Sequence, residues 1–125
     1  MVKNWTRIEM LLALYERTIM TIRCAKQADQ EGNAGELAGK TLEANRFILA
    51  LHAGLDTENC EIAQNIANLL NFVMLRLGQR KFDEAARFLE ELQASFERIR
   101  EEAEELEKKG EIPPLNSHQA INTIV

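Results

Sequence analysis

Few side chains in this sequence have the types and spacing that enzymatic chemistry requires. Its histidines and cysteines are His52, His118, Cys24 and Cys60. A di-iron site in a helical bundle would need Glu-x-x-His pairs, and neither histidine stands in such a motif. Ser95 and Ser117 lack a plausible His and acid relay, and Gly-rich phosphate loops are absent. We therefore predict no catalytic site, no metal and no cofactor.

His52 offers the one alternative with a covalent step, because histidine phosphotransfer domains are also small helical bundles. Such domains usually carry a Lys and a Gly closely after the histidine on one exposed helix face. Here the histidine is followed by Ala53-Gly54-Leu55-Asp56, where we expect the helix to end. No cation would then steady a phosphoryl group, so we predict a turn or capping role for His52.

The two cysteines and the first residues indicate the compartment. Cys24 and Cys60 are far apart in the sequence, and two such thiols in a cytosolic chain are expected to be reduced and partly buried. The first residues, Met1-Val2-Lys3-Asn4-Trp5, contain no apolar leader, and no segment of membrane-spanning length lacks charge. We therefore expect a cytoplasmic protein without membrane insertion.

The composition favours one all-helical domain. The chain has 125 residues, 46% of them hydrophobic, which suffices for one compact core. It contains only 6 Gly and 2 Pro, and both prolines stand near the end, at Pro113-Pro114. The formal net charge of -5 and the lack of a basic block interleaved with aromatic residues argue against nucleic acid as a partner.

Apolar residues recur every three or four positions in four stretches, which predicts helices over 5–28, 36–52, 58–77 and 81–109. Glu31-Gly32-Asn33 separates the first two, and Gly54 ends the second, with Asp56 or Thr57 expected to cap the third. Gly78 ends the third, and Gly110 and the prolines end the fourth. Because the connections are short, we predict an antiparallel up-and-down four-helix bundle over 1–110 and a flexible tail over 111–125.

The last helix shows a heptad stripe of the kind that bundles bury. This stripe consists of Ala85, Leu89, Leu92, Phe96, Ile99, Ala103 and Leu106. The opposite face, from Glu97 to Lys109, is rich in Glu, Lys and Arg. We expect that face to be solvated surface.

Two helices carry more apolar residues than one core can cover. Between Leu69 and Leu77 the apolar side chains point almost all the way round the helix axis, and Met10 to Leu14 has no polar break. Neighbouring helices and the tail are one possible cover for these faces. The others are an apolar segment of a partner, received in a groove, or a second copy of the chain.

Several segments resemble the flagellin export chaperone (FliS) family in order and spacing. They are Leu11-Leu12-Ala13-Leu14-Tyr15-Glu16-Arg17-Thr18-Ile19, the turn from Leu49 to Asp56, Glu61-Ile62-Ala63-Gln64-Asn65-Ile66, Arg76-Leu77 and Phe88-Leu89-Glu90-Glu91-Leu92-Gln93-Ala94-Ser95-Phe96. The resemblance implies an antiparallel helical bundle. It also implies a protein that binds the C-terminal segment of flagellin, blocks its premature polymerisation and helps to deliver it to the flagellar export apparatus.

The resemblance also implies the contact residues and the partners. It places Tyr15, Ile62, Asn65, Leu69, Phe72 and Arg76 near the groove, where the apolar members would give affinity and the polar members orientation. Components of the export apparatus are further expected partners, and a monomer or weak homodimer is the expected state. The alternative is a homo-oligomeric helical adaptor that buries the same apolar faces between subunits.

The sequence departs from the family pattern at several positions. The family's Tyr-Asp-Tyr has become Leu70-Asn71-Phe72, its turn asparagine is His52, and a Gly is Cys60. Few residues precede the first expected helix, so we expect the family's N-terminal arm, which covers the groove in its members, to be missing or replaced here. We therefore expect a divergent relative whose client contacts differ.

Overall fold

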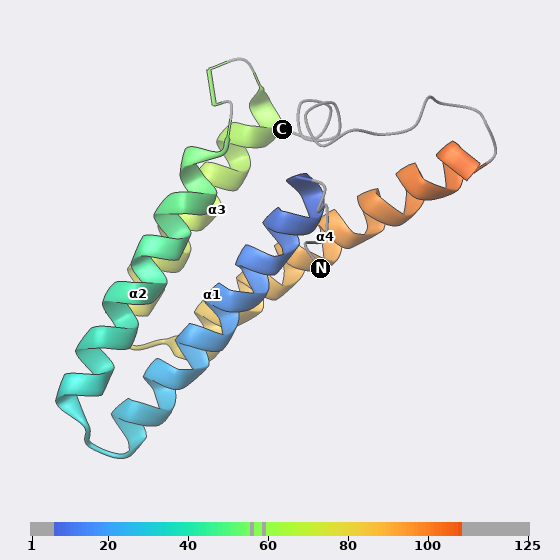
Figure 1. Cartoon of the computed structure of the whole chain (residues 1–125). Helices are drawn as coiled ribbons and strands as arrows, with labels where there is room; N and C mark the ends of the chain where they lie inside the picture. The colour runs from blue at the N-terminus through green and yellow to red at the C-terminus, as the bar shows by residue number, and fades with distance from the viewer. Residues whose placement is uncertain (1–6, 56, 59, 109–125) are drawn as a thin grey trace.

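The computed structural model describes residues 7–55, 57–58 and 60–108, and these residues form four helices connected by short turns. The helices are α1 (Arg7–Gln30), α2 (Ala34–Ala53), α3 (Glu61–Gly78) and α4 (Phe82–Lys108). They run up and down side by side, as Figure 1 shows. The predicted all-α, antiparallel four-helix bundle is confirmed, and the predicted helix ends differ from the observed ones by a few residues. The predicted tail over 111–125 lies outside the described residues.

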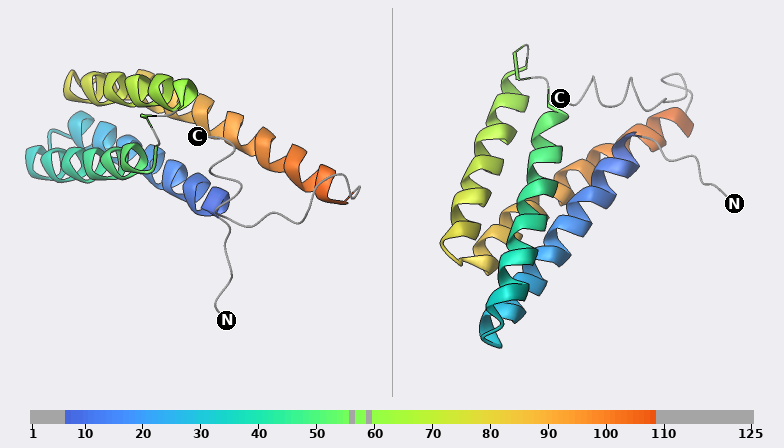
Figure 2. Two further views of the ribbon diagram at one scale, coloured as in Figure 1. Left: turned by 90° about the horizontal axis from the view of Figure 1, so that it is seen from above. Right: turned by 60° about the vertical axis from the view of Figure 1, so that its left-hand side comes forward.

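The helices form two layers of two. Figure 2 shows α1 and α2 in one layer and α3 and α4 in the other. α1 contacts both α2 and α4, and α3 contacts both α4 and α2, so α1 and α3 lie on a diagonal of the bundle. Among the described residues, no helix has the length and apolar character of a membrane span.

The turn between α1 and α2 forms as the sequence predicts. Gly32 has a φ of 71°, a left-handed conformation that a residue without Cβ adopts at little cost. Asn33 is the N-cap of α2, and its side chain accepts a hydrogen bond of 3.1 Å from the backbone N–H of Glu36. Glu31-Gly32-Asn33 therefore both ends the first helix and starts the second.

The turn between α2 and α3 differs from its prediction. Gly54 has a φ of -80°, so α2 ends there without the left-handed conformation for which a glycine was expected. Cys60, and not Thr57, is the N-cap of α3, and its own side chain makes no capping hydrogen bond. Asp56 lies outside the described residues. The carbonyl of Thr57 accepts a hydrogen bond of 2.7 Å from the side chain of Gln64, which ties the turn to the first turns of α3.

The turn between α3 and α4 has its left-handed residue at Arg80, with a φ of 61°, and not at Gly78, which the sequence suggests. The backbone N–H of Lys81 donates to the carbonyl of Arg76, which closes the end of α3. Gly78 is the last residue of α3.

One stripe of each helix fills the core. Its largest fully buried side chains include Tyr15, Ile19, Ile22, Ile48, Leu70, Val73, Leu77 and Leu89. Two buried threonines, Thr18 and Thr21, donate hydrogen bonds to the carbonyls of Leu14 and Arg17 in their own helix, so their hydroxyls are satisfied. The heptad stripe of α4 faces this core: Ala85, Leu89 and Phe96 are buried, and Leu92 and Ile99 are half-buried against it. The side chains of Ala103 and Leu106 lie outside the described residues.

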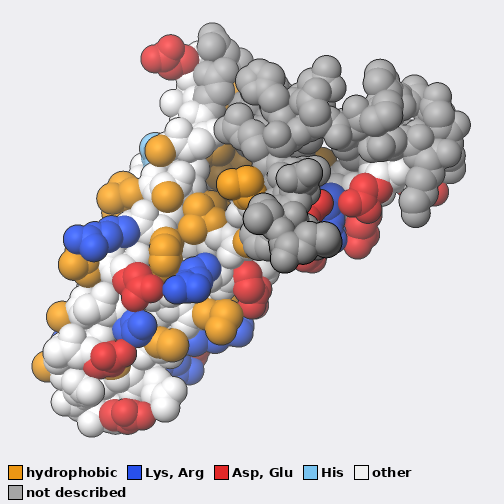
Figure 3. All heavy atoms as spheres, viewed as in Figure 1, with side chains coloured by type: hydrophobic (Ala, Val, Ile, Leu, Met, Phe, Trp, Pro, Cys, Tyr) orange, Lys and Arg blue, Asp and Glu red, His pale blue; other side chains and the backbone are white. Residues whose placement is uncertain are grey.

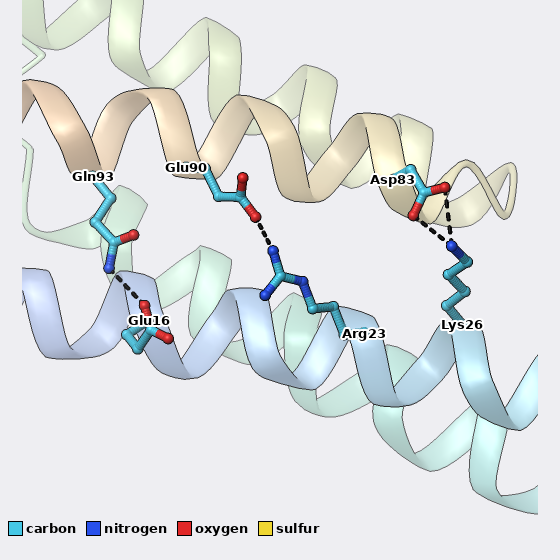
Figure 4. Close-up of polar contacts among 6 residues, drawn as sticks. All are labelled: Glu16, Arg23, Lys26, Asp83, Glu90 and Gln93. Carbon is cyan, nitrogen blue, oxygen red and sulfur yellow. Dashed lines mark hydrogen bonds and ion pairs between the residues drawn. The ribbon is translucent and has the colours of Figure 1, made fainter.

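Polar pairs connect α1 to α4 along the edge of the bundle, as Figure 4 shows. Gln93 donates to Glu16 over 2.9 Å, and Lys26 Nζ lies 2.8 Å from Asp83 Oδ1. Between these two contacts Arg23 pairs with Glu90. Exposed pairs of this kind contribute only about 0.2–1 kcal/mol each, so they favour the antiparallel register while the buried stripe supplies most of the stability.

Truncating a buried residue of α4 should cost far more than removing one of these pairs. We expect Leu89→Ala to lower the free energy of unfolding by about 2–5 kcal/mol, because it leaves a cavity in the core. Lys26→Ala should lower it by about 1 kcal/mol or less. Urea unfolding followed by far-UV circular dichroism measures both values, and equal losses in the two variants would contradict this account of the core.

Candidate functional site

Apolar surface remains after the core is filled. Among the described residues, the large hydrophobic side chains that are more than half exposed are Met10, Met20, Leu42, Leu49, Ile62 and Leu75. Met10, Met20 and Leu75 confirm the apolar excess predicted for parts of α1 and α3. Ile62 lies outside the predicted stretch of α3, and the exposure of Leu42 and Leu49 in α2 was not predicted. Figure 3 shows the α1 and α2 side, where hydrophobic side chains are interrupted by Lys, Arg, Asp and Glu.

Five of the six contact residues implied by the resemblance form one line along α3. Ile62, Asn65, Leu69, Phe72 and Arg76 follow one another at steps of three, four, three and four residues. At about 100° per residue, these steps place all five within about 80° of the helix circumference. We call this line the α3 stripe.

Near the turn into α4, the α3 stripe is packed against that helix. The rings of Phe72 and Phe88 meet edge to face, with their centroids 5.2 Å apart. The guanidinium of Arg76 lies 4.5 Å from the centroid of the Phe72 ring, and its Nε lies 3.3 Å from Glu84 Oε1. The Nε makes an ion pair without the alignment of a hydrogen bond, while Nη1 donates to Gln79 over 3.0 Å. We call Phe72, Arg76, Glu84 and Phe88 the Phe72 cluster.

At the start of α3 the same stripe is open. Ile62 and Asn65 are exposed and Leu69 is half-buried. Figure 2 shows why: α3 and α4 are close where the turn joins them and diverge toward the start of α3. The α3 stripe is therefore closed at the Phe72 cluster and accessible at Ile62.

The exposed surface of α3 is nearly free of charge. Of its 18 residues only Glu61 and Arg76 are charged. The exposed positions between them carry the neutral side chains of Gln64, Asn65, Asn68 and Asn71, besides Ile62 and Leu75. Depletion of charge is typical of the centre of a protein interface, because each buried charge has to be desolvated. The α3 surface therefore suits an uncharged or apolar protein segment.

Tyr15, the sixth implied contact residue, lies elsewhere. It is 1% exposed, and its ring packs against Phe96 of α4 with the centroids 5.8 Å apart. Burial raises the pKa of its hydroxyl far above the usual value, because the tyrosinate would lose its hydration. In this structure Tyr15 is a core residue that a partner does not reach.

The other candidate groups of the sequence analysis that the structure describes include His52, Cys24 and Cys60, while Ser117 and His118 lie outside the described residues. His52 is half-buried in the last turn of α2, consistent with its predicted turn role. Cys24 is exposed and Cys60 half-buried, so the expectation of a partly buried thiol is wrong for Cys24. In the part of the chain that the structure describes, no three His, Cys, Asp or Glu side chains gather in a way that could hold a metal ion.

Sequence reasoning missed the α4 side of the candidate surface. Glu84 and Phe88 stand four residues apart on α4 and face Arg76 and Phe72, which stand four residues apart on α3. Matching pairs of an aromatic and a charged residue at this spacing on two adjacent antiparallel helices were a signal that could have indicated the contact.

The described residues form an antiparallel helical bundle in which α3 is partly open and its exposed surface is nearly free of charge. The chain belongs to the FliS family, because the family model described as flagellar protein FliS matches residues 1–110. This family consists of flagellar chaperones, which act in flagellum assembly. No curated protein and no solved structure matches the chain.

The burial of Tyr15 predicts a delayed titration. An unfolded tyrosine has a pKa of about 10, and folding raises that value here, so the stability that the buried neutral form contributes is lost as the pH rises above about 10. Because the chain holds 1 Tyr, tyrosinate absorbance reports on Tyr15 alone. We expect this absorbance to appear only when the protein unfolds. Titration of the native protein at the pH where the urea-unfolded protein titrates would contradict the burial.

Proposed function

We propose that this chain is a cytoplasmic export chaperone that binds the C-terminal segment of flagellin along the α3 stripe. Binding there keeps the segment from polymerising before export and presents the complex to components of the export apparatus. The observation that carries the proposal is the α3 stripe itself, in which Ile62 and Asn65 are exposed on a helix of a FliS-family bundle whose surface is nearly free of charge.

The residues of the α3 stripe take different roles in this proposal. Ile62 and Leu69 offer apolar area, and covering such side chains contributes about 25 cal/mol per Å² of surface removed from water. Asn65 stands between them and can donate and accept hydrogen bonds, so it orients the segment. Phe72 and Arg76 are held by Phe88 and Glu84, so they form a preorganised end to the surface.

The proposed working state is a monomer or a weak homodimer. A chaperone has to leave its client surface accessible, whereas an obligate dimer through α3 would cover Ile62. The Phe72 cluster supports this state, because it satisfies the buried end of the α3 stripe within one chain.

Calorimetric titration with the C-terminal segment of flagellin tests the proposal, with two charge insertions on α3 as a matched pair. Ile62 and Leu75 are exposed to similar extents, 60% and 56%, and lie about 140° apart around the helix. We expect one-to-one binding with a negative heat-capacity change, weakened at least about tenfold by Ile62→Asp. Leu75→Asp should change the affinity by less than about twofold, because Leu75 points away from the α3 stripe.

Two outcomes would count against the proposal. Equal weakening by both substitutions would separate binding from the α3 stripe. No binding by the folded protein, together with a mass that rises with concentration in light scattering, would favour the homo-oligomeric adaptor.

A further inference from the structure

Several of the incompletely covered hydrophobic side chains lie at one end of the bundle. It is the end at which α1 begins, α2 passes into α3, and α4 runs past the other helices (Figures 1 and 2). The partly buried residues in these segments that pack against the core are Leu11, Leu14, Leu55, Cys60, Ile66 and Ile99. We call this region the open end. The exposed Ile62 lies at this end too, in the first turn of α3.

The residues that follow α4 differ sharply in composition from the helix before them. Residues 112–125 read Ile-Pro-Pro-Leu-Asn-Ser-His-Gln-Ala-Ile-Asn-Thr-Ile-Val and include no Asp, Glu, Lys or Arg, whereas 28% of the whole chain is charged. A segment without charge can cover apolar surface without a charge to desolvate. It therefore matches in chemistry the open end and the surface of α3, on which Glu61 is the one charged residue of the first turn.

This segment also has the required apolar pattern. Ile121, Ile124 and Val125 stand at i, i+3 and i+4, so one turn of helix would place all three on one face. Such spacing is the usual set of anchors for a helix laid into an apolar groove. Asn122 and Thr123 would point to other sides of the same turn.

The chain beyond α4 is long enough to return to the open end. From Ile99 to Lys108 the helix rises about 14 Å. The five residues 109–113 can span about 17 Å when extended, so they suffice to come back to the level of Ile99. Residues 114–125 are then free to lie across the open end, and Pro113-Pro114 favours an extended approach without helix.

We propose that residues 112–125 dock on the open end of their own bundle through Ile121, Ile124 and Val125, covering Leu55, Ile66 and Ile62. The occupant is the chain's own uncharged segment, and the surface includes the accessible end of the α3 stripe. Docking of this segment therefore competes with any protein segment that binds at Ile62. The docking itself does not rest on the identity of the client, so it is measured without flagellin.

Two double variants of the full chain test the docking by fluorescence of an apolar dye. Ile121→Asp/Ile124→Asp places two charges on the docking face, and Asn122→Asp/Thr123→Asp adds the same two charges between those anchors. We expect the first variant to raise dye fluorescence at least about threefold over the unmodified chain, because the open end becomes accessible. The second should stay near the unmodified chain. Equal fluorescence of the two variants would overturn the proposal.

A cross-link locates the segment and shows whose bundle it covers. Thr123→Cys with Cys24→Ser leaves Cys60 at the open end as the second thiol, and Thr123→Cys with Cys60→Ser leaves Cys24, which is exposed in the distant half of α1. A short bis-maleimide should link Cys60 within a single chain and link Cys24 much less. Links mainly between two chains, or equal links to both cysteines, would overturn docking on the same bundle.

Flagellin titration separates this proposal from the proposed function. If the segment competes, Ile121→Asp/Ile124→Asp should bind flagellin at least about threefold more tightly than its matched control. An unchanged affinity would show that the segment does not cover the client surface and would overturn the competition. A chain that shows the dye and cross-link results but binds no flagellin would refute the proposed function and leave the docking intact.

Discussion

A helix can turn only one side toward a single core, and this constraint decides where the surface of the bundle is apolar. In α3 the core takes Ala63, Leu70, Val73 and Leu77, which lie on the side facing the other helices. Ile62 and Leu69 belong to a neighbouring line, which α4 meets at Phe72, near the turn. The candidate surface is thus the part of the apolar pattern of α3 that the divergence of two helices leaves unfilled.

The charges of the bundle are sorted in a way that supports this division. Lys26, Asp83, Arg23 and Glu90 pair along the edge between α1 and α4, while α3 carries only Glu61 and Arg76. Arg76 already has Glu84 and the face of the Phe72 ring as partners. Arg76 therefore keeps its partners when another segment covers α3, and Glu61 in the first turn is the other charge on that helix. The cost of removing charges from water on binding is low for this reason.

The sequence predicted the helices and most of the core, because periodic Leu, Ile and Ala positions such as Leu89 and Ala85 allow one arrangement in a small bundle. It predicted the helix ends at Gly54 and Gly78, but not the N-cap at Cys60 or the left-handed turn at Arg80, since turns respond to tertiary contacts that no local pattern reports. Tyr15 shows two signals in conflict. Its spacing with Ile8 and Ile19 places it in the core, the resemblance made it a contact residue, and the structure buries it.

The pairing of Arg76 with Glu84 lay beyond sequence reasoning for a different reason. The two residues belong to different helices, and their meeting depends on how closely α3 approaches α4 beside the turn. From the sequence, the accessible part of the α3 stripe could be predicted only as a line of residues. Its accessibility follows from the angle between two helices, which periodicity does not determine.

Mutations at the two ends of the α3 stripe would have different effects on the stability of the bundle. Phe72 and Arg76 hold α3 against α4, so a substitution there changes the fold and the surface together. Ile62 and Asn65 are exposed and carry little of the packing, so substitutions there change the surface at small cost in stability. Selection for a new partner can therefore act on the first two turns of α3 while the bundle stays intact.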